Sequence, residues 1–190
     1  MAPMHSAELD PAEHQLLFQV ARRAVSGAEP AIPAHRASLS RRLLTPAATF
    51  VTLHHRSALR GCIGTLEPRR PLVDDVAHNA WSAAFRDPRF PPLPQAQAPE
   101  VALSISILGP SEPLDVENED ILLQSLRPGM DGVILEDGPH RSTFLPAVWE
   151  QLPQPAEFMA ALRRKAGLPA NHWSDTLNLW RYTVAVLEEP

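Results

Sequence analysis

The chain has a single cysteine, no long apolar run and little positive charge, and each shortage excludes a class of protein. One cysteine among 190 residues rules out an intramolecular disulfide framework and the small secreted scaffolds that depend on one. No apolar stretch approaches the roughly 18 residues that a membrane-spanning helix needs. The opening residues, MAPMHSAELDPAEHQ, lack the basic and apolar segments of a signal peptide. We therefore expect a cytoplasmic protein with no membrane partner.

Basic residues are outnumbered by acidic ones, 17 against 22, which leaves a net charge of -5. Proteins that bind nucleic acid are usually basic, so this balance argues against nucleic acid as a partner. The paired ligands of common zinc sites are also missing. His54 and His55 are adjacent, and neighbouring residues on a strand point to opposite faces. We expect neither a metal nor a cofactor.

The sequence does contain clear hydrophobic periodicity, and it predicts helices interleaved with strands. Apolar residues recur at helical spacing in three segments, 10–27, 71–85 and 155–168, and a shorter helix is expected within 117–126. The first helix should begin with a capping box formed by Asp10 and Glu13. Segment 28–46 is typical of a loop with one short helical turn.

Strand patterns fill most of the remaining chain. Segments 48–68 and 132–145 predict β-hairpins, 100–108 alternates as a half-buried strand does, and 177–187 predicts one closing strand. Hairpins outnumber regular strand–helix–strand units, which indicates an α+β fold with a mainly antiparallel sheet and flanking helices.

The sole cysteine lies in the hexapeptide LRGCIG, residues 59–64. Gly61 and Gly64 would let backbone N–H groups stabilise a thiolate or a developing oxyanion, and Arg60 adds a cation that favours the thiolate. Cys62 is therefore a candidate nucleophile or covalent acceptor, with Arg60 as its candidate thiolate stabiliser. A buried structural thiol in a tight bulge is the alternative, and the local sequence leaves both open.

A cysteine nucleophile usually works with a histidine base. His54, His55 and His78 are nearest in sequence, but none of them lies in a recognisable catalytic signature. The sequence leaves open which histidine, if any, assists Cys62.

A second motif, FRDPRFPPL, spans residues 85–93. Pro88 holds Asp87 in extended geometry, and Arg86 and Arg89 flank it with opposite charge. We predict a rigid turn close to the cysteine hairpin, in which Asp87 pairs with an arginine or caps backbone N–H groups. The two arginines are candidates for holding a carboxylate or a phosphate.

These two motifs, together with NAWSAAFRDPRFPPL, DGVILEDG, STFLPAVWEQLP and KAGLP in order, resemble the AMMECR-type domain family closely. The bacterial and archaeal form of that family is called AmmeMemoRadiSam system protein A. The resemblance runs from about residue 16 to 186 and implies a single domain over 1–190. It also implies two lobes, with the LRGCIG segment facing a cleft between them.

The resemblance further implies partners, a Memo-like protein and a radical SAM protein, and a small-molecule ligand in the cleft. Matching the motifs residue by residue adds a set of candidate binding residues to Cys62 and Arg60. They are Gly61, Ile63, Gly64, Thr65, Arg86, Asp87 and Arg89.

Three function classes remain open. The first is an enzyme or covalent carrier that acts through Cys62. The second is a non-catalytic module that binds or scaffolds its partner proteins. The third is a nucleotide or RNA binder, which the acidic charge opposes.

Overall fold

The computed structural model describes residues 9–27 and 38–189, and the chain divides into two compact units. Unit 1 is Met1–Leu108 with Ala185–Pro190, and unit 2 is Gly109–Val184. Both units combine helices with antiparallel strand pairs, which confirms the α+β prediction. The predicted cleft between two lobes stays a prediction.

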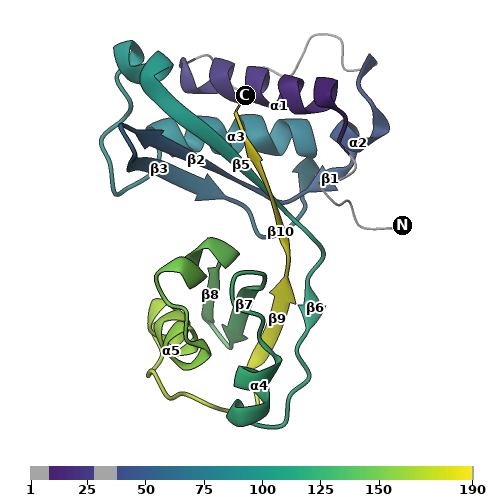
Figure 1. Ribbon diagram of the computed structural model, residues 1–190, viewed down its shortest axis with the longest axis vertical. Coiled ribbons are helices and arrows are strands. Elements are labelled where there is room, and N and C mark those ends of the chain that lie inside the picture. The colour runs from purple at the N-terminus through teal and green to yellow at the C-terminus, as the bar shows by residue number, and fades with distance from the viewer. Residues whose placement is uncertain (1–8, 28–37, 190) are drawn as a thin grey trace. The chain divides into compact units, whose positions relative to one another are not determined.

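Unit 1 is a four-stranded sheet, in the order β10-β5-β2-β3, with two long helices on one side (Figure 1). The elements of this unit that matter for the site are α1 (Pro11–Val25), β2 (Thr49–His55), β3 (Ala58–Gly64), α3 (Leu72–Phe85), β5 (Val101–Leu108) and β10 (Val184–Glu188). Shorter elements are α2 (Arg41–Leu44), β1 (Pro46–Ala47), β4 (Arg70–Pro71) and the 3-10 helix Gln95–Glu100. Strands β1 and β4 pair with each other in a separate two-stranded sheet.

Alternate residues of the strands form the core of unit 1 with α1 and α3. Val51 and Leu53 of β2 are fully buried, as are Val76 and Ala80 of α3. Thr52 lies between two core residues of β2 and therefore belongs to the sheet face turned away from the helices. The amphipathic patterns thus place polar side chains together on that second face.

The start of α1 and the β2–β3 turn follow from local sequence. Asp10 and Glu13 exchange side chain–backbone hydrogen bonds of 2.8 and 3.0 Å, which confirms the capping box. Arg56 and Ser57 both have positive φ, 51° and 66°, as a two-residue hairpin turn that matches strand twist requires. The predicted hairpin over this segment is confirmed.

Unit 2 has its own sheet, in the order β6-β9-β7-β8, and its own core. Its elements are β6 (Glu112–Pro113), α4 (Glu119–Ser125), β7 (Gly132–Asp137), β8 (His140–Phe144), the 3-10 helix Pro146–Glu150, α5 (Pro155–Lys165) and β9 (Asn178–Tyr182). Trp149 stacks on Phe158 with 3.8 Å between ring centroids, and both are buried among leucines. The predicted hairpin and the two predicted helices of this unit are confirmed.

The single closing strand predicted over 177–187 is wrong. The structure has two strands there, β9 and β10, and they belong to different sheets (Figure 1). Between them, the carbonyl of Thr183 accepts a hydrogen bond of 2.8 Å from Gly109 N–H. A continuous run of strand-forming residues predicts extended backbone, but it does not indicate which sheet each part joins.

Within the described ranges, no helix combines the length and the apolar character that crossing a membrane requires.

Candidate functional site

The candidate site is built where the second motif meets the edge of the unit 1 sheet. Strand β3 is an edge strand, so its outward backbone groups have no neighbouring strand to pair with. At Cys62 two side chains form hydrogen bonds with these backbone groups instead. The Asp87 carboxylate accepts the Cys62 N–H at 2.9 Å, and Arg89 Nη2 donates to the Cys62 carbonyl at 3.2 Å. The ion pair of the FRDPRFPPL turn thus covers the strand edge at the cysteine.

Asp87 is the centre of this arrangement. It is 3% exposed, and besides Cys62 it accepts hydrogen bonds from Arg89 at the backbone N–H (3.1 Å), Nε (2.9 Å) and Nη2 (2.7 Å). The hydrogen bond from the Arg89 side chain is the main cause that lowers the pKa of Asp87 to about 2, against the opposing effect of burial. Asp87 is therefore a carboxylate at every physiological pH. The prediction that it pairs with an arginine close to the cysteine is confirmed.

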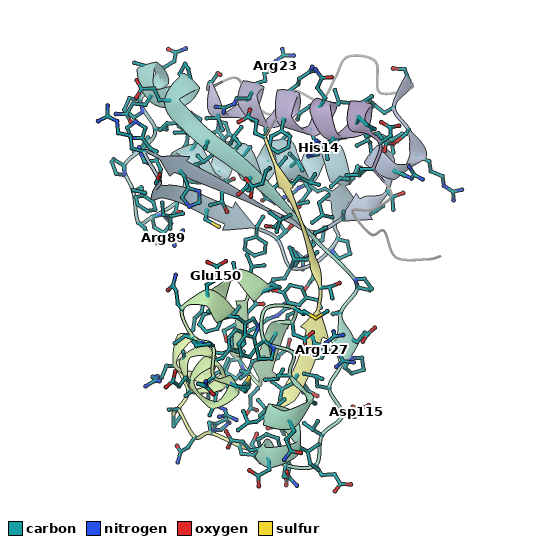
Figure 2. The ribbon with its side chains drawn as sticks, viewed as in Figure 1. His14, Arg23, Arg89, Asp115, Arg127 and Glu150 are labelled. Atoms are coloured by element: carbon teal, nitrogen blue, oxygen red, sulfur yellow. The ribbon has the colours of Figure 1, made fainter. Side chains whose placement is uncertain are left out.

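The thiol of Cys62 faces away from α1 and α3. A Cβ placed on the preceding Gly61 would lie 2.1 Å from the Ala83 carbonyl of α3, so Gly61 faces the helix and Cys62 the opposite side. Figure 2 labels Arg89 on the side of the unit 1 sheet that lies away from α1, the helix that carries Arg23. The cysteine is half-buried, which places it outside the aliphatic core.

A hydroxyl group donates to this sulfur. Thr52 lies directly opposite Cys62 on β2, and its Oγ1 donates to Sγ at 3.2 Å. Because the Cys62 backbone groups point outward to Asp87 and Arg89, the two residues form a non-hydrogen-bonded pair, in which side chains approach most closely. The pairing register therefore brings the hydroxyl to the sulfur.

The cation that hydrogen-bonds to Cys62 is Arg89, whereas the sequence suggested Arg60. The pKa of Arg89 is raised, mainly by its hydrogen bond to Asp87, and the Cys62 side chain contributes to the same shift. Arg60 instead donates from Nη2 to the Pro91 carbonyl at 2.8 Å, and its guanidinium lies 5.9 Å from the Phe90 ring centre. The register of β3 against β2 shifts at this point and leaves Arg60 without a strand partner, as in a β-bulge. The regular alternation that would align Arg60 with Cys62 is interrupted here.

The two glycines are explained by close packing. At Gly61 a side chain would collide with the helix backbone, and at Gly64 it would lie 2.2 Å from the Phe50 ring. The expectation that they free backbone N–H groups for the thiolate is wrong at Cys62, because Asp87 already accepts that N–H. Ile63 packs against the core of unit 1.

Thr65 belongs to a buried polar network that the sequence did not reveal. Its Oγ1 donates to Asp75 Oδ2 at 2.7 Å, and the same oxygen accepts from Thr49 Oγ1 (2.8 Å) and Asn79 Nδ2 (2.9 Å). Asp75 is fully buried, and Arg70 lies 3.3 Å from its other oxygen. The sequence feature that could have predicted this network is a pair of polar residues, Asp75 and Asn79, four positions apart on the apolar face of α3. The network joins the end of β3 to this helix.

The remaining candidates lie apart from the sulfur. Arg86 is exposed, and its guanidinium lies 5.1 Å from the Trp81 ring centre. His55 pairs with Glu100 at 2.9 Å, and burial followed by the Arg70 charge lowers the pKa of His78. His54 shares the second sheet face with Thr52. In the described part of the chain, none of these histidines hydrogen-bonds to Cys62.

No group of three or more histidine, cysteine, aspartate or glutamate side chains in residues 9–27 and 38–189 is arranged to hold a metal ion. The site therefore consists of a thiol, a hydroxyl donor and a buried ion pair.

The fold and the site define an α+β protein with a half-buried thiol on a sheet edge that an aspartate–arginine pair covers. The chain belongs to the AMMECR1 family, whose family model matches residues 17–187, and this confirms the resemblance seen in the motifs.

Similar proteins support the same assignment. A protein of Methanothermobacter thermautotrophicus is 39% identical to the chain over 142 residues, which cover 74% of either protein. The protein MJ0810 of Methanocaldococcus jannaschii is 36% identical over 148 residues, or 74% of this chain and 72% of that protein. The crystal structure of an uncharacterized protein, PH0010 from Pyrococcus horikoshii, matches with a TM-score of 0.84 at 29% identity, covering 93% of this chain and 91% of that one.

Proposed function

We propose that this protein acts through the thiol of Cys62, as a nucleophile or as a covalent acceptor of a group taken from a substrate. The observation that carries the proposal is the hydrogen bond from Thr52 Oγ1 to Sγ, 3.2 Å long, at a half-buried sulfur. A thiolate is the reactive form of cysteine, and nearby hydrogen-bond donors and cations stabilise it. Arg89 also donates a hydrogen bond to the backbone carbonyl of Cys62.

The buried ion pair supports this role by fixing the backbone of the nucleophile. Asp87 and Arg89 hold both the N–H and the carbonyl of Cys62, so the sulfur keeps one position relative to the Thr52 hydroxyl. A positioned group reacts faster than a mobile one because less orientational freedom is lost on the way to the transition state.

The partners follow from the family resemblance alone. We infer that the protein works in the cytoplasm with a Memo-like protein and a radical SAM protein. A single free cysteine is consistent with a reducing compartment, where thiols stay reduced.

A partner-binding module without chemistry is the second candidate. It is favoured by the lack of a histidine hydrogen-bonded to the sulfur among the described residues, because most cysteine nucleophiles use such a base. Nucleotide or RNA binding stands third, since the net charge of -5 opposes it.

The test of the first proposal is the rate at which iodoacetamide alkylates the protein, followed by intact mass. Because Cys62 is the sole cysteine, the thiol adduct reports on this residue alone. We expect the native protein to react faster at pH 7 than the same chain unfolded in urea. Thr52→Val should slow the native reaction about threefold, in keeping with the loss of one modest hydrogen bond.

The matched control is Ser104→Ala, which removes a hydroxyl from the strand residue that pairs with Thr52 on its other side. It should leave the rate unchanged. A native thiol that reacts no faster than the unfolded chain would exclude the nucleophile and leave the binding module as the function.

A further inference from the structure

The arginines of the two motifs around Cys62 differ in what balances their charge. Elsewhere in the described chain many arginines pair with carboxylates, as Arg22 does with Glu189 and Arg127 with Asp131, although exposed arginines such as Arg23 do not. Arg60 and Arg86 have no ion-pair partner among residues 9–27 and 38–189. Arg60 lies two residues before Cys62, and Arg86 directly precedes Asp87, so both unbalanced cations belong to the two motifs that meet at the Cys62 backbone.

Two aromatic residues lie against these cations, Phe90 of the second motif and Trp81 of α3. Phe90 lies 5.9 Å from the Arg60 guanidinium and 5.5 Å from that of Arg89, so one ring carries two like charges. Arg86 lies over Trp81. Stacking of this kind fixes a guanidinium without neutralising it, because a ring has no net charge. The negative charge of Asp87 balances only the positive charge of Arg89.

Arg60 also has a guanidinium nitrogen that donates no hydrogen bond. Its Nη2 donates to the Pro91 carbonyl, but its Nη1 is buried and makes no hydrogen bond. A buried polar atom without a partner costs free energy, and such atoms are rare in native proteins. An acceptor from a ligand would satisfy this nitrogen.

We propose that the Cys62 site binds a small molecule that carries an oxyanion, a carboxylate or a phosphate, which Arg60 recognises with help from Arg86. The proposal rests on the proposed function in one respect: it names the class of substrate that would meet the thiol. Guanidinium groups suit this ligand because their planar fork matches two oxygens of one oxyanion.

The first experiment compares two alkylating reagents that differ in charge. In both reactions the Cys62 thiolate displaces iodide and forms an S–C bond, but iodoacetate carries a carboxylate and iodoacetamide does not. The measured quantity is the ratio of the iodoacetate rate to the iodoacetamide rate. The ratio for the chain unfolded in urea is the reference, because it contains the same thiol without the site.

We expect the native ratio to exceed the unfolded ratio, and Arg60→Gln to lower it roughly threefold, the size of effect that one nearby unit charge has in water. Arg86→Gln should lower it less. Arg23→Gln is the matched control, since it removes the same charge from an exposed position on α1, on the other side of the unit 1 sheet from Arg89 (Figure 2). Added salt should reduce the native ratio toward the reference.

A second experiment needs no reactive thiol. In the Cys62→Ser protein, the ¹⁵N–¹H signals of the arginine Nε groups are followed while inorganic phosphate or acetate is added at constant ionic strength. A saturable shift at Arg60 and none at Arg23 supports the proposal, and the stronger of the two anions tells phosphate from carboxylate. Equal native and unfolded ratios together with no saturable shift at Arg60 would overturn it.

The two proposals fail in different ways. A slow native reaction with iodoacetamide contradicts the nucleophile but leaves the phosphate and acetate titrations to decide on the oxyanion. A fast native reaction, with an unchanged reagent ratio and no saturable shift at Arg60, contradicts only the oxyanion proposal.

Discussion

At the scale of single residues, the Asp87 carboxylate joins two segments that are 25 positions apart in the sequence. Its hydrogen bonds with the Cys62 backbone and with Arg89 are made in the folded chain and lost on unfolding. A buried charge that is fully paired stabilises the fold, whereas one left without its partner destabilises it strongly. Asp87 is therefore a position where stability and the site depend on the same side chain.

Replacing Asp87 with asparagine should lower the free energy of unfolding by about 2–3 kcal/mol at pH 7, because Arg89 loses its partner and the Cys62 N–H its acceptor. The pKa of Asp87 is lowered from 3.8 to about 2 in the folded chain. A carboxyl with a lowered folded pKa contributes stability that is present above its unfolded pKa and lost as the pH falls through its folded one. The contribution is about 2 kcal/mol and should disappear between pH 4 and pH 2.

The measurement is urea unfolding of the parent and of Asp87→Asn at several pH values from 7 down to 2. The difference between the two proteins should shrink as the pH falls below 4. Asp115→Asn, which removes the same charge from an exposed residue, serves as the control and should track the parent throughout. A difference that stayed constant down to pH 2 would contradict the role given to Asp87.

At the scale of elements, strand β3 and helix α3 approach each other so closely that their contact leaves no room for a side chain. The contact lies at Gly61, where the neighbouring atom is a backbone carbonyl of the helix. Gly64 has a different neighbour, the ring of its cross-strand partner Phe50. The glycines of the first motif thus serve two separate contacts on the two faces of β3.

Gly61→Ala should lower the free energy of unfolding by about 3 kcal/mol or more, because the helix backbone cannot yield without moving α3. Gly64→Ala should cost less, about 2 kcal/mol, since a ring can turn aside. The comparison is made by denaturant unfolding with both variants in the parent and in a Phe50→Ala background.

Removing the ring should relieve Gly64→Ala and leave Gly61→Ala unchanged, so only the pair of Gly64 and Phe50 should show coupling. Equal costs for the two alanine variants, with no relief by Phe50→Ala, would contradict the packing explanation of the motif.

At the scale of the whole molecule, each unit has a core built from its own residues. The core of unit 2 is formed only by residues between 109 and 184, including Trp149 and Phe158. The core of unit 1 takes one residue, Leu187, from the end of the chain, and Glu189 there pairs with Arg22. The chain therefore leaves unit 1 at residue 108 and returns to it at residue 185.

The fragment 109–184 should fold by itself, because its core is contiguous in sequence and lies within the size range of autonomous domains. We expect a cooperative thermal transition and a near-ultraviolet circular dichroism signal from Trp149, both lost in Phe158→Ala. Truncation of the full chain after residue 184 should instead lower the stability of unit 1, since Leu187 and Glu189 are removed. A fragment 109–184 without a cooperative transition would show that unit 2 depends on unit 1.

The sequence by itself determined most of the elements. Apolar spacing placed α1, α3 and α5, and the capping box at Asp10 placed a helix start, because these features depend on residues within one or two turns of each other. The segment 177–187 was also predicted correctly to be extended, yet the prediction missed the break at Thr183. The spacing of apolar residues predicts whether a segment is a helix or a strand, but it does not predict which other element the segment pairs with.

The family motifs likewise pointed to Cys62, Asp87 and Arg89 before any geometry was known. Only the tertiary structure decided how these residues meet: that Asp87 accepts the Cys62 N–H, that Thr52 donates to the sulfur and that Arg60 turns to Pro91. These contacts depend on strand register, on a shift of one residue in β3 and on the approach of α3. Such features arise from packing between distant segments, so no local pattern in the chain could specify them.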